Sequence, residues 1–170
     1  AVVLWETFGT DAVPATGDLI KSVTYSNEKI VFQTADTFKE GNAVIAAVDA
    51  SGNILWSWHI WFTDQPQAQV YKNNAGTMMD RNLGATSATP DDVGALGLLY
   101  QWGRKDPFLG SSRIGGYTLA KSTITWPSAV SSNSTNGTIN YATANPTTFI
   151  FYNSKNWDWY YTGDSSTDNT

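Results

Sequence analysis

The chain has 170 residues, a formal net charge of −5 and no cysteine. This length is enough for one ordinary domain or two small ones. The lack of cysteine excludes a disulfide framework, a thiolate metal site and a cysteine nucleophile. The ten basic residues form no cluster, which argues against a nucleic-acid partner, because binding to phosphates depends on Lys and Arg. The low charge content and abundant Gly, Ser, Thr and Asn are typical of secreted β-proteins, so we expect an extracellular location.

The chain shows no segment that would cross a membrane. No run approaches the ~20 apolar residues that a membrane-spanning helix needs. The first residues, "AVVLWETFG", lack the basic region of a signal peptide, and the last, "TGDSSTDNT", complete no predicted element. We therefore expect this sequence to be a piece of a longer protein.

Period-two alternation of apolar and polar residues from Ala1 to Phe62 predicts half-buried strands. The stretches "LIKSVTY" and "IVFQT" flank the turn "SNEK" and predict a hairpin. The small apolar run from Ala43 to Val48 predicts a strand that is covered on both faces. In the following "DASGN", Asp49 opens a turn and Gly52 takes the left-handed position that closes a bulged hairpin.

The return strand of this hairpin contains "WSWHIWFTD", which holds three tryptophans and the single histidine. Alternation places Trp56 and Trp58 on a fully apolar face, which we predict to be core. It places His59 and Trp61 on the other face. A Ser-His-Asp triad would have to use His59, but its mid-strand position predicts a structural role in which it bonds an acceptor on that face. Trp61 then meets the second region, another chain or a ligand.

A break in the alternation, "TDQPQAQVYKNNAG", marks a boundary between about residues 64 and 76, and we divide the chain into regions 1–66 and 67–170. Beyond the boundary, "TMMDRNL" predicts a short strand. In "DDVGALGLLYQWG", Asp91 or Asp92 can cap a helical turn. In "ANPTTFIFYN", Asn145 as N-cap and Pro146 at the first helical position predict the start of a helix.

Two short motifs, "MDRNLGA" and "YQWGRKDPF", each bring an arginine close to an aspartate. The pairs are Asp80 with Arg81 and Arg104 with Asp106. The planar guanidinium satisfies several backbone carbonyls or a carboxylate at once, so both motifs predict structural pinning of loops. A clamp for a ligand carboxylate or phosphate is the alternative interpretation.

A second aromatic cluster lies in "NWDWYY" and carries the candidate ligand-binding residues. Rings next to carboxylate and amide groups suit a sugar, whose apolar face stacks on them, but the same tryptophans can also fill a core. The candidates are Trp157, Asp158, Trp159, Tyr160 and Tyr161, together with Trp61. The oxygen ligands of Asp164 and Asp168 lack the glycine and glutamate of a calcium loop. We assign no metal and no cofactor.

The stretches "GNAVIAAVDASGNILWSWHIWFTD" and "MMDRNLGATSATPDDVGALGLLYQWGRKDPF" resemble surface and fimbria-associated proteins of Bacteroidetes. These proteins carry the Fibrobacter major paralogous domain and are often described as fimbrillin-like. The resemblance is strong from Asn42 to Phe108 and weaker up to Tyr161. Its structural motif comprises Asp80, Arg81, Asn82, Trp102, Arg104 and Asp106.

This resemblance implies a mainly β protein. An N-terminal antiparallel β-sandwich-like region would lead into an irregular, partly helical region similar to C-type lectins and formylglycine-generating enzymes. The family segment that completes the second region is not found in this sequence, so we expect that region to be incomplete. The resemblance implies no enzymatic activity. We expect a cell-surface or fimbrial adhesion module that contacts other protein chains, with glycan binding through the aromatic cluster as the alternative.

Overall fold

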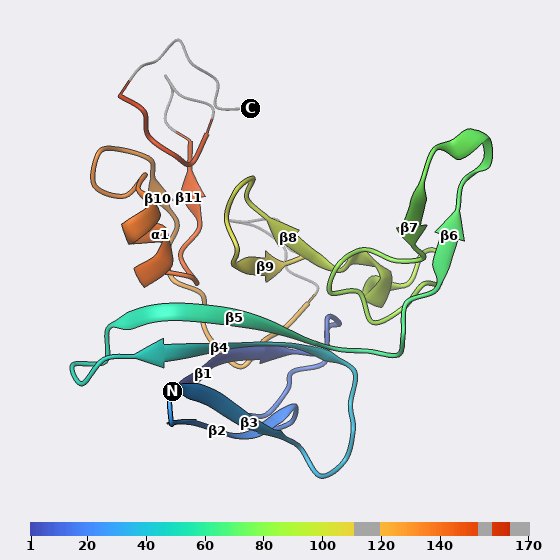
Figure 1. Ribbon diagram of the computed structural model, residues 1–170, viewed down its shortest axis with the longest axis horizontal. Helices are drawn as coiled ribbons and strands as arrows, with labels where there is room; N and C mark the ends of the chain where they lie inside the picture. The colour runs from blue at the N-terminus through green and yellow to red at the C-terminus, as the bar shows by residue number, and fades with distance from the viewer. Residues whose placement is uncertain (111–119, 153–157, 164–170) are drawn as a thin grey trace.

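The computed structural model describes residues 1–110, 120–152 and 158–163 (Figure 1). The fold is mainly β and consists of small sheets, most of them antiparallel. The first region contains β1 (Val2–Thr7), β2 (Ile20–Ser26), β3 (Lys29–Thr34), β4 (Gly41–Val48) and β5 (Ile54–Phe62). The second contains β6 (Ala68–Val70), η1 (Lys72–Asn74), β7 (Thr77–Met79), η2 (Val93–Leu96), β8 (Leu98–Tyr100), β9 (Pro107–Leu109), β10 (Val130–Ser131), α1 (Ile139–Ala144) and β11 (Ile150–Phe151).

A three-stranded antiparallel sheet in the order β1-β4-β5 forms the centre of the molecule. β4 is its middle strand, and every residue from Gly41 to Ala46 is buried, which confirms the predicted strand with two covered faces. The turn that follows is also confirmed. Gly52 has φ +85°, and the Asp49 carboxylate accepts from the amides of Ser51 and Asn53, both at 2.8 Å.

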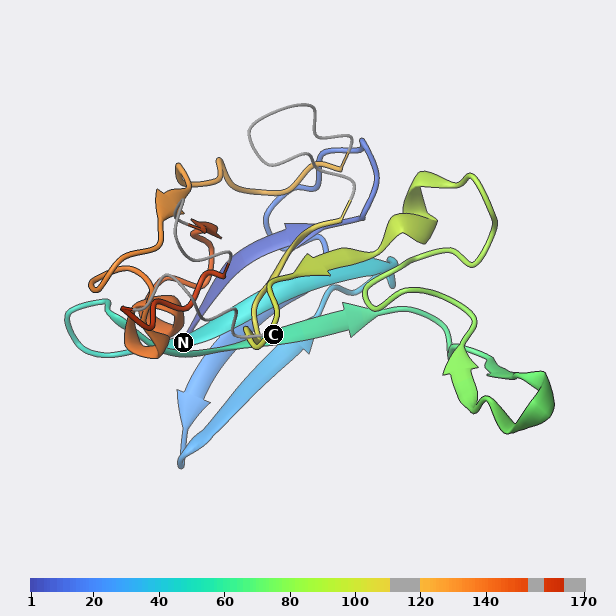
Figure 2. The same cartoon turned by 90° about the horizontal axis from the view of Figure 1, so that it is seen from above.

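The β2–β3 hairpin, which was predicted, packs under one face of this sheet (Figures 1 and 2). Its core cluster joins Leu19 and Ile20 to Ala43, Ile45 and Phe62. β2 contacts β1 and β4, so the cover lies under these two strands. This limited cover decides which side chains of β5 become core.

The prediction that Trp56 and Trp58 are core residues is wrong. Trp56 is 45% exposed and Trp58 is 39% exposed, whereas Phe62 at the other end of β5 is 8% exposed. β5 is an edge strand, and the core cluster under the sheet reaches only its end at Ile60 and Phe62. Alternation shows which side chains share a face, but it does not show how far that face is covered.

The second region covers the other face of the sheet. Trp5 and Val44 on that face form a buried cluster with Leu98 of β8, and the Trp5 ring lies 5.4 Å from that of Trp126. Ser57, His59 and Trp61 of β5 lie on the same face, because the β4 residues opposite them share the face of Val44. The more polar face of β5 is therefore the one that the second region contacts.

The predicted helix start at Asn145 and Pro146 is wrong, because the helix ends there. α1 begins after Thr138, whose side chain accepts from the Tyr141 amide at 3.1 Å, and Asn145 is its C-cap. A proline disfavours helical geometry in the residue before it, which explains why the helix stops. The other predicted helical turn is present as η2, capped by the Asp92 side chain.

The Glu6 carboxylate holds the start of β2 against the central sheet. Glu6 is 0% exposed and accepts backbone hydrogen bonds from Gly17, Leu19 and Ile20 at 2.7, 2.9 and 2.7 Å. We expect Glu6→Ala to lower the free energy of unfolding by about 3–5 kcal/mol, because it leaves buried amides without an acceptor. Urea denaturation measures this loss.

The matched control is Asp36→Ala, which removes a carboxylate that is 76% exposed and paired with Lys21. Exposed ion pairs contribute only ~0–1 kcal/mol, so this variant should be close to the parent protein. Equal stability losses in the two variants would contradict the structural role given to Glu6.

Candidate functional site

A chain of four hydrogen-bonding groups crosses from the central sheet to the second region. The Tyr100 hydroxyl lies 3.0 Å from His59 Nδ1, and His59 Nε2 lies 2.9 Å from Asn42 Oδ1. Asn42, which is 0% exposed, donates through Nδ2 to the Gly84 carbonyl at 2.8 Å. These contacts join β4, β5, β8 and the loop before η2, and we call them the His59 chain.

Only one assignment of donors and acceptors satisfies all the hydrogen bonds of the His59 chain. Because Asn42 Nδ2 donates to Gly84, Asn42 Oδ1 faces the histidine as an acceptor, so Nε2 carries the proton. Nδ1 then accepts from the Tyr100 hydroxyl. Burial, followed by the charge of Asp106, raises the pKa of Tyr100 to about 12, which keeps this donor protonated. Both ring nitrogens of His59 are thus engaged within the protein, as the predicted structural role requires.

Gly84 is required where this chain meets the second region. Its φ is +82°, and a Cβ there would lie 2.5 Å from the Leu98 side chain and 3.1 Å from Asn42 Oδ1. An L-residue disfavours this backbone conformation. The glycine of the "DRNLGA" motif therefore lets the loop approach the sheet closely, and next to it Trp61 Nε1 donates to the Ala85 carbonyl at 3.1 Å.

Asp106 forms a second connection between the two regions. Its Oδ1 accepts from the Ser57 hydroxyl at 2.6 Å and from Lys105 Nζ at 2.7 Å. Lys105 also donates to Ser57, and its ammonium lies 4.6 Å from the centre of the Trp56 ring. The motif suggested that Asp106 pairs with Arg104, but its ion-pair partner is Lys105.

Arg104 pins a loop through backbone carbonyls, as predicted. It is 7% exposed and donates to the carbonyls of Thr148 and Asn145 at 2.9 and 3.2 Å and to the Gln101 side chain at 2.6 Å. Its Nε is buried and has no hydrogen-bond partner among the described residues. Leaving this buried donor unpaired costs about 1–3 kcal/mol.

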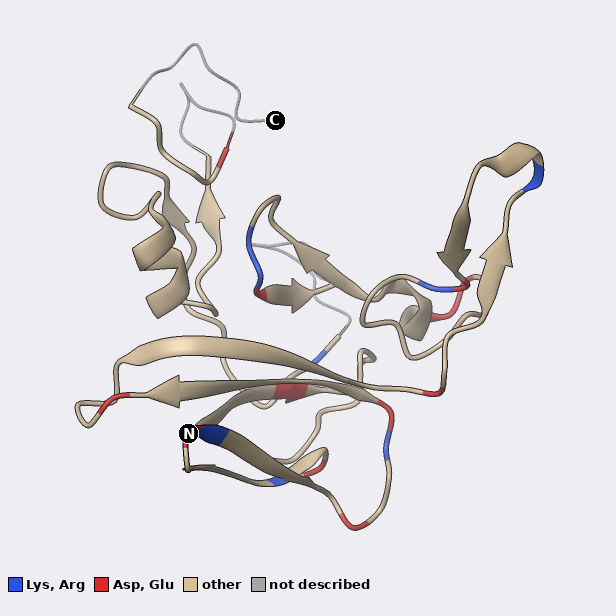
Figure 3. Cartoon of the chain, viewed as in Figure 1, with Lys and Arg blue, Asp and Glu red and all other residues tan. Residues whose placement is uncertain are grey.

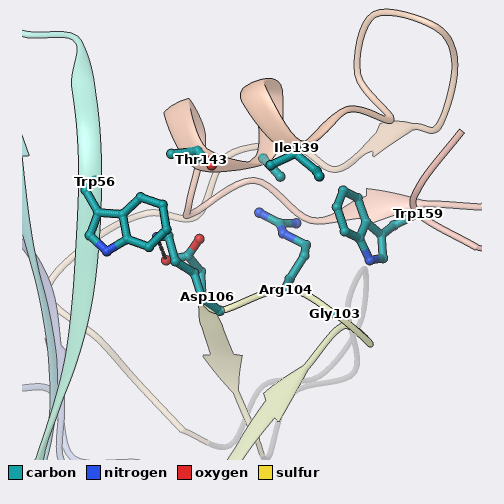
Figure 4. Close-up of a pocket in the computed structure, with 9 residues that line it drawn as sticks. Trp56, Gly103, Arg104, Asp106, Ile139, Thr143 and Trp159 are labelled. Carbon is teal, nitrogen blue, oxygen red and sulfur yellow. Dashed lines mark hydrogen bonds and ion pairs between the residues drawn. The ribbon is translucent and has the colours of Figure 1, made fainter.

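A cleft of about 170 Å³ lies between β5 and α1 (Figure 4). Trp56 and Trp159 stand on opposite sides of it, and Arg104 lies between them. It is lined by Trp56, Gly103, Arg104, Lys105, Asp106, Ile139, Ala142, Thr143 and Trp159. We call it the Trp56 cleft. It combines indole rings with one carboxylate and two cationic side chains.

The β6–β7 hairpin projects from the body of the molecule at the end of the sheet opposite α1 (Figures 1 and 2). We call residues 68–79 the arm. All residues of both strands are exposed. Four large apolar side chains stand on it: Val70 (78% exposed), Tyr71 (53%), Met78 (63%) and Met79 (47%).

Arg81 fastens the base of the arm, as the first Arg-Asp motif predicted. Its side chain is 7% exposed, and it donates to both carboxylate oxygens of Asp80 at 2.8 and 3.1 Å. It also donates to Thr63 and Asp64. The guanidinium thus joins the chain segments that enter and leave the arm, where charged residues gather (Figure 3).

The other predicted site residues lie in several places. Trp159 is 8% exposed and donates from Nε1 to the Trp102 carbonyl at 2.6 Å. Tyr160 is 39% exposed, and Asp158 and Tyr161 are half-buried. Trp102 itself is 80% exposed, and Asn82 donates to the η2 carbonyls of Ala95 and Leu96. Trp157, Asp164 and Asp168 lie outside the described residues.

Sequence reasoning missed the partners that complete these sites. Asn42 lies in a predicted strand and Tyr100 in a predicted helical turn, and only their contacts with His59, which is 17 and 41 residues away respectively, give them a role. The exposure of Trp56 follows from the edge position of β5, and a sequence pattern does not give the strand order.

Comparison with protein-family models, with curated proteins and with solved structures finds no match for this chain. In the described part of the chain, no helix is both long and apolar enough to cross a membrane. The same residues contain no group of three or more His, Asp and Glu side chains placed to hold a metal ion. The function must therefore be argued from the geometry.

The pH dependence of stability tests the burial of His59. Burial lowers the pKa of His59 from 6.5 to about 4, so between these values the unfolded chain binds a proton that the folded chain does not. Stability is then complete above pH 6.5 and falls as the pH approaches 4. We expect a loss of about 2 kcal/mol between pH 7 and pH 5, measured by urea denaturation at each pH.

The reference for this measurement is His59→Gln, which has no titrating ring but keeps every Asp and Glu of the protein. Its stability should change by less than the parent's over the same interval. A parent and variant with identical pH profiles would show that His59 titrates in the folded protein as it does in the unfolded one.

Proposed function

We propose that this chain is a non-enzymatic module of a bacterial cell-surface or fimbrial assembly and that it acts through contacts with other protein chains. The resemblance to fimbrillin-like proteins with the Fibrobacter major paralogous domain supports this location. In this proposal the first region belongs to the β-sandwich-like part of such proteins and the second to the C-type-lectin-like part. The mainly β fold agrees with both assignments.

The arm is the observation that carries the proposal. A two-stranded hairpin is at best marginally stable in water when it packs on nothing. In the arm every residue of both strands is exposed, and the hairpin presents the apolar side chains of Val70, Tyr71, Met78 and Met79 to solvent. Exposed apolar clusters of this kind mark protein interaction sites, and Tyr and Met are enriched in such interfaces. A partner protein that covers the arm would stabilise it.

The base of the arm fits a docking role. Arg81 holds both ends of the arm through its ion pairs with Asp80 and Asp64. Asp64 lies just after the end of β5. A projecting element with a fixed base loses less conformational freedom on binding than a free loop does. The arm is therefore placed to be recognised as a preformed structure.

The residues with the greatest catalytic potential are already committed to structural contacts. Both nitrogens of His59 have partners, and the sequence has no cysteine. Arg104 spends three of its donors on neighbouring oxygens. These uses favour a module without enzymatic activity.

Site-specific photo-cross-linking on the producing bacterium tests this proposal. A benzophenone amino acid is introduced at Tyr71 or Met78 on the arm, and the cells are irradiated. We expect covalent adducts of discrete mass with another protein chain, because the arm lies inside the interface. The adducts are identified by mass spectrometry, and a second copy of this chain counts as a protein partner.

The control places the same amino acid at Phe38, which is 65% exposed on the loop between β3 and β4. This position should give no adduct or a different pattern. The proposal fails if both arm positions give no adduct, or if Phe38 gives the same adducts as the arm.

A further inference from the structure

We infer that the Trp56 cleft is a binding site for a single neutral sugar ring. The site shares Trp159 with the aromatic cluster that the sequence suggested, but its exposed wall is Trp56 of β5. It also lies at the opposite end of the sheet from the arm (Figure 1). The inference is therefore independent of the proposed protein contacts.

The size of the cleft suits one ring. Its volume is about 170 Å³, and a cavity of roughly 150 Å³ is known to accommodate benzene. Sites for drug-sized ligands are larger, at roughly 300–1,000 Å³. The cleft can therefore enclose one six-membered ring while the rest of a longer chain stays outside.

The walls of the cleft suit the apolar face of a pyranose. Trp56 leaves 45% of its surface exposed and faces the cleft from β5, while Trp159 stands opposite (Figure 4). An indole ring carries negative charge on its face, which attracts the weakly positive C–H groups of a sugar. Trp159 is 8% exposed, its ring lies 5.7 Å from the Arg104 guanidinium, and it is held by its bond to Trp102. Trp56 therefore supplies the stacking surface, and Trp159 closes the opposite side.

The floor of the cleft offers an acceptor and a hydroxyl group. Asp106 uses Oδ1 for Ser57 and Lys105, and within the described chain its Oδ2 accepts no hydrogen bond. Thr143 adds a hydroxyl from α1. One sugar hydroxyl can donate to the carboxylate, and another can accept from the Thr143 hydroxyl.

The charges in the cleft favour a neutral ligand. The Lys105 ammonium is paired with Asp106, and the terminal nitrogens of Arg104 are bonded to protein oxygens. A charged sugar therefore finds no free counter-charge in the cleft, whereas a neutral ring needs none. The paired charges, the Trp56 indole and the volume thus agree on a neutral pyranose.

Titration of the intact protein with three sugars of the same ring tests this inference. The probes are methyl glucopyranoside, glucuronate and glucosamine, and indole resonances are followed by ¹H–¹⁵N NMR. Methyl galactopyranoside and methyl mannopyranoside extend the neutral set. We expect at least one neutral glycoside to shift the Trp56 indole resonance in a saturable way, with a Kd on the order of 1 mM. Glucuronate and glucosamine should bind more weakly than that glycoside.

Trp56→Ala should weaken binding by at least about tenfold. The matched control is Trp102→Ala, because Trp102 is 80% exposed and contributes only its backbone carbonyl to Trp159. This variant should bind as the parent does. Near-UV circular dichroism and urea denaturation check that both variants are folded, and Trp56→Phe, which keeps a ring, should retain part of the binding.

The inference is overturned if no neutral glycoside gives a saturable shift at Trp56. It is also overturned if a charged sugar binds more tightly than every neutral one, or if Trp56→Ala and Trp102→Ala weaken binding equally.

Discussion

The His59 chain is the interaction on which the arrangement of this protein depends. It links two neighbouring strands of the central sheet through Asn42 and His59 and continues to the second region through Tyr100 and Gly84. β5 then extends from this contact in both directions. One end supplies Trp56 to the cleft, and the chain beyond the other end supplies Asp64 to the base of the arm. Both proposed recognition sites are thus positioned by one strand whose middle is fixed by buried polar contacts.

Buried polar groups are stabilising only when all of them are satisfied, because an unpaired one loses its hydration without compensation. The His59 chain meets this condition with neutral groups, and burial keeps the pKa of His59 at about 4. The Ser57–Asp106 contact meets it with Lys105 as counter-charge. In the Trp56 cleft, Asp106 uses only Oδ1 within the described chain, which leaves Oδ2 for a ligand hydroxyl. The unequal satisfaction of these groups separates structural contacts from a candidate binding site.

The sequence predicted local structure well where residue chemistry acts over a few positions. The apolar run of β4, the turn with Asp49 and Gly52, and the Arg81 pin all follow from short-range patterns. It failed where the outcome depends on strand order or on competing caps. Trp56 is exposed because β5 is an edge strand with partial cover, and α1 begins at the Thr138 cap and stops before Pro146. The cleft was not predictable, because it joins β5, the loop between β8 and β9, and α1, which are distant in sequence.

We expect the central sheet to need the second region on its polar face. The most direct test is to produce residues 1–66 alone and to measure urea unfolding by near-UV circular dichroism next to the intact chain. Without Gly84, Tyr100 and Leu98, the buried Asn42 and Trp5 lose their cover. We expect the shorter chain to show no cooperative unfolding transition. A cooperative transition at the same urea concentration as in the intact chain would contradict the account.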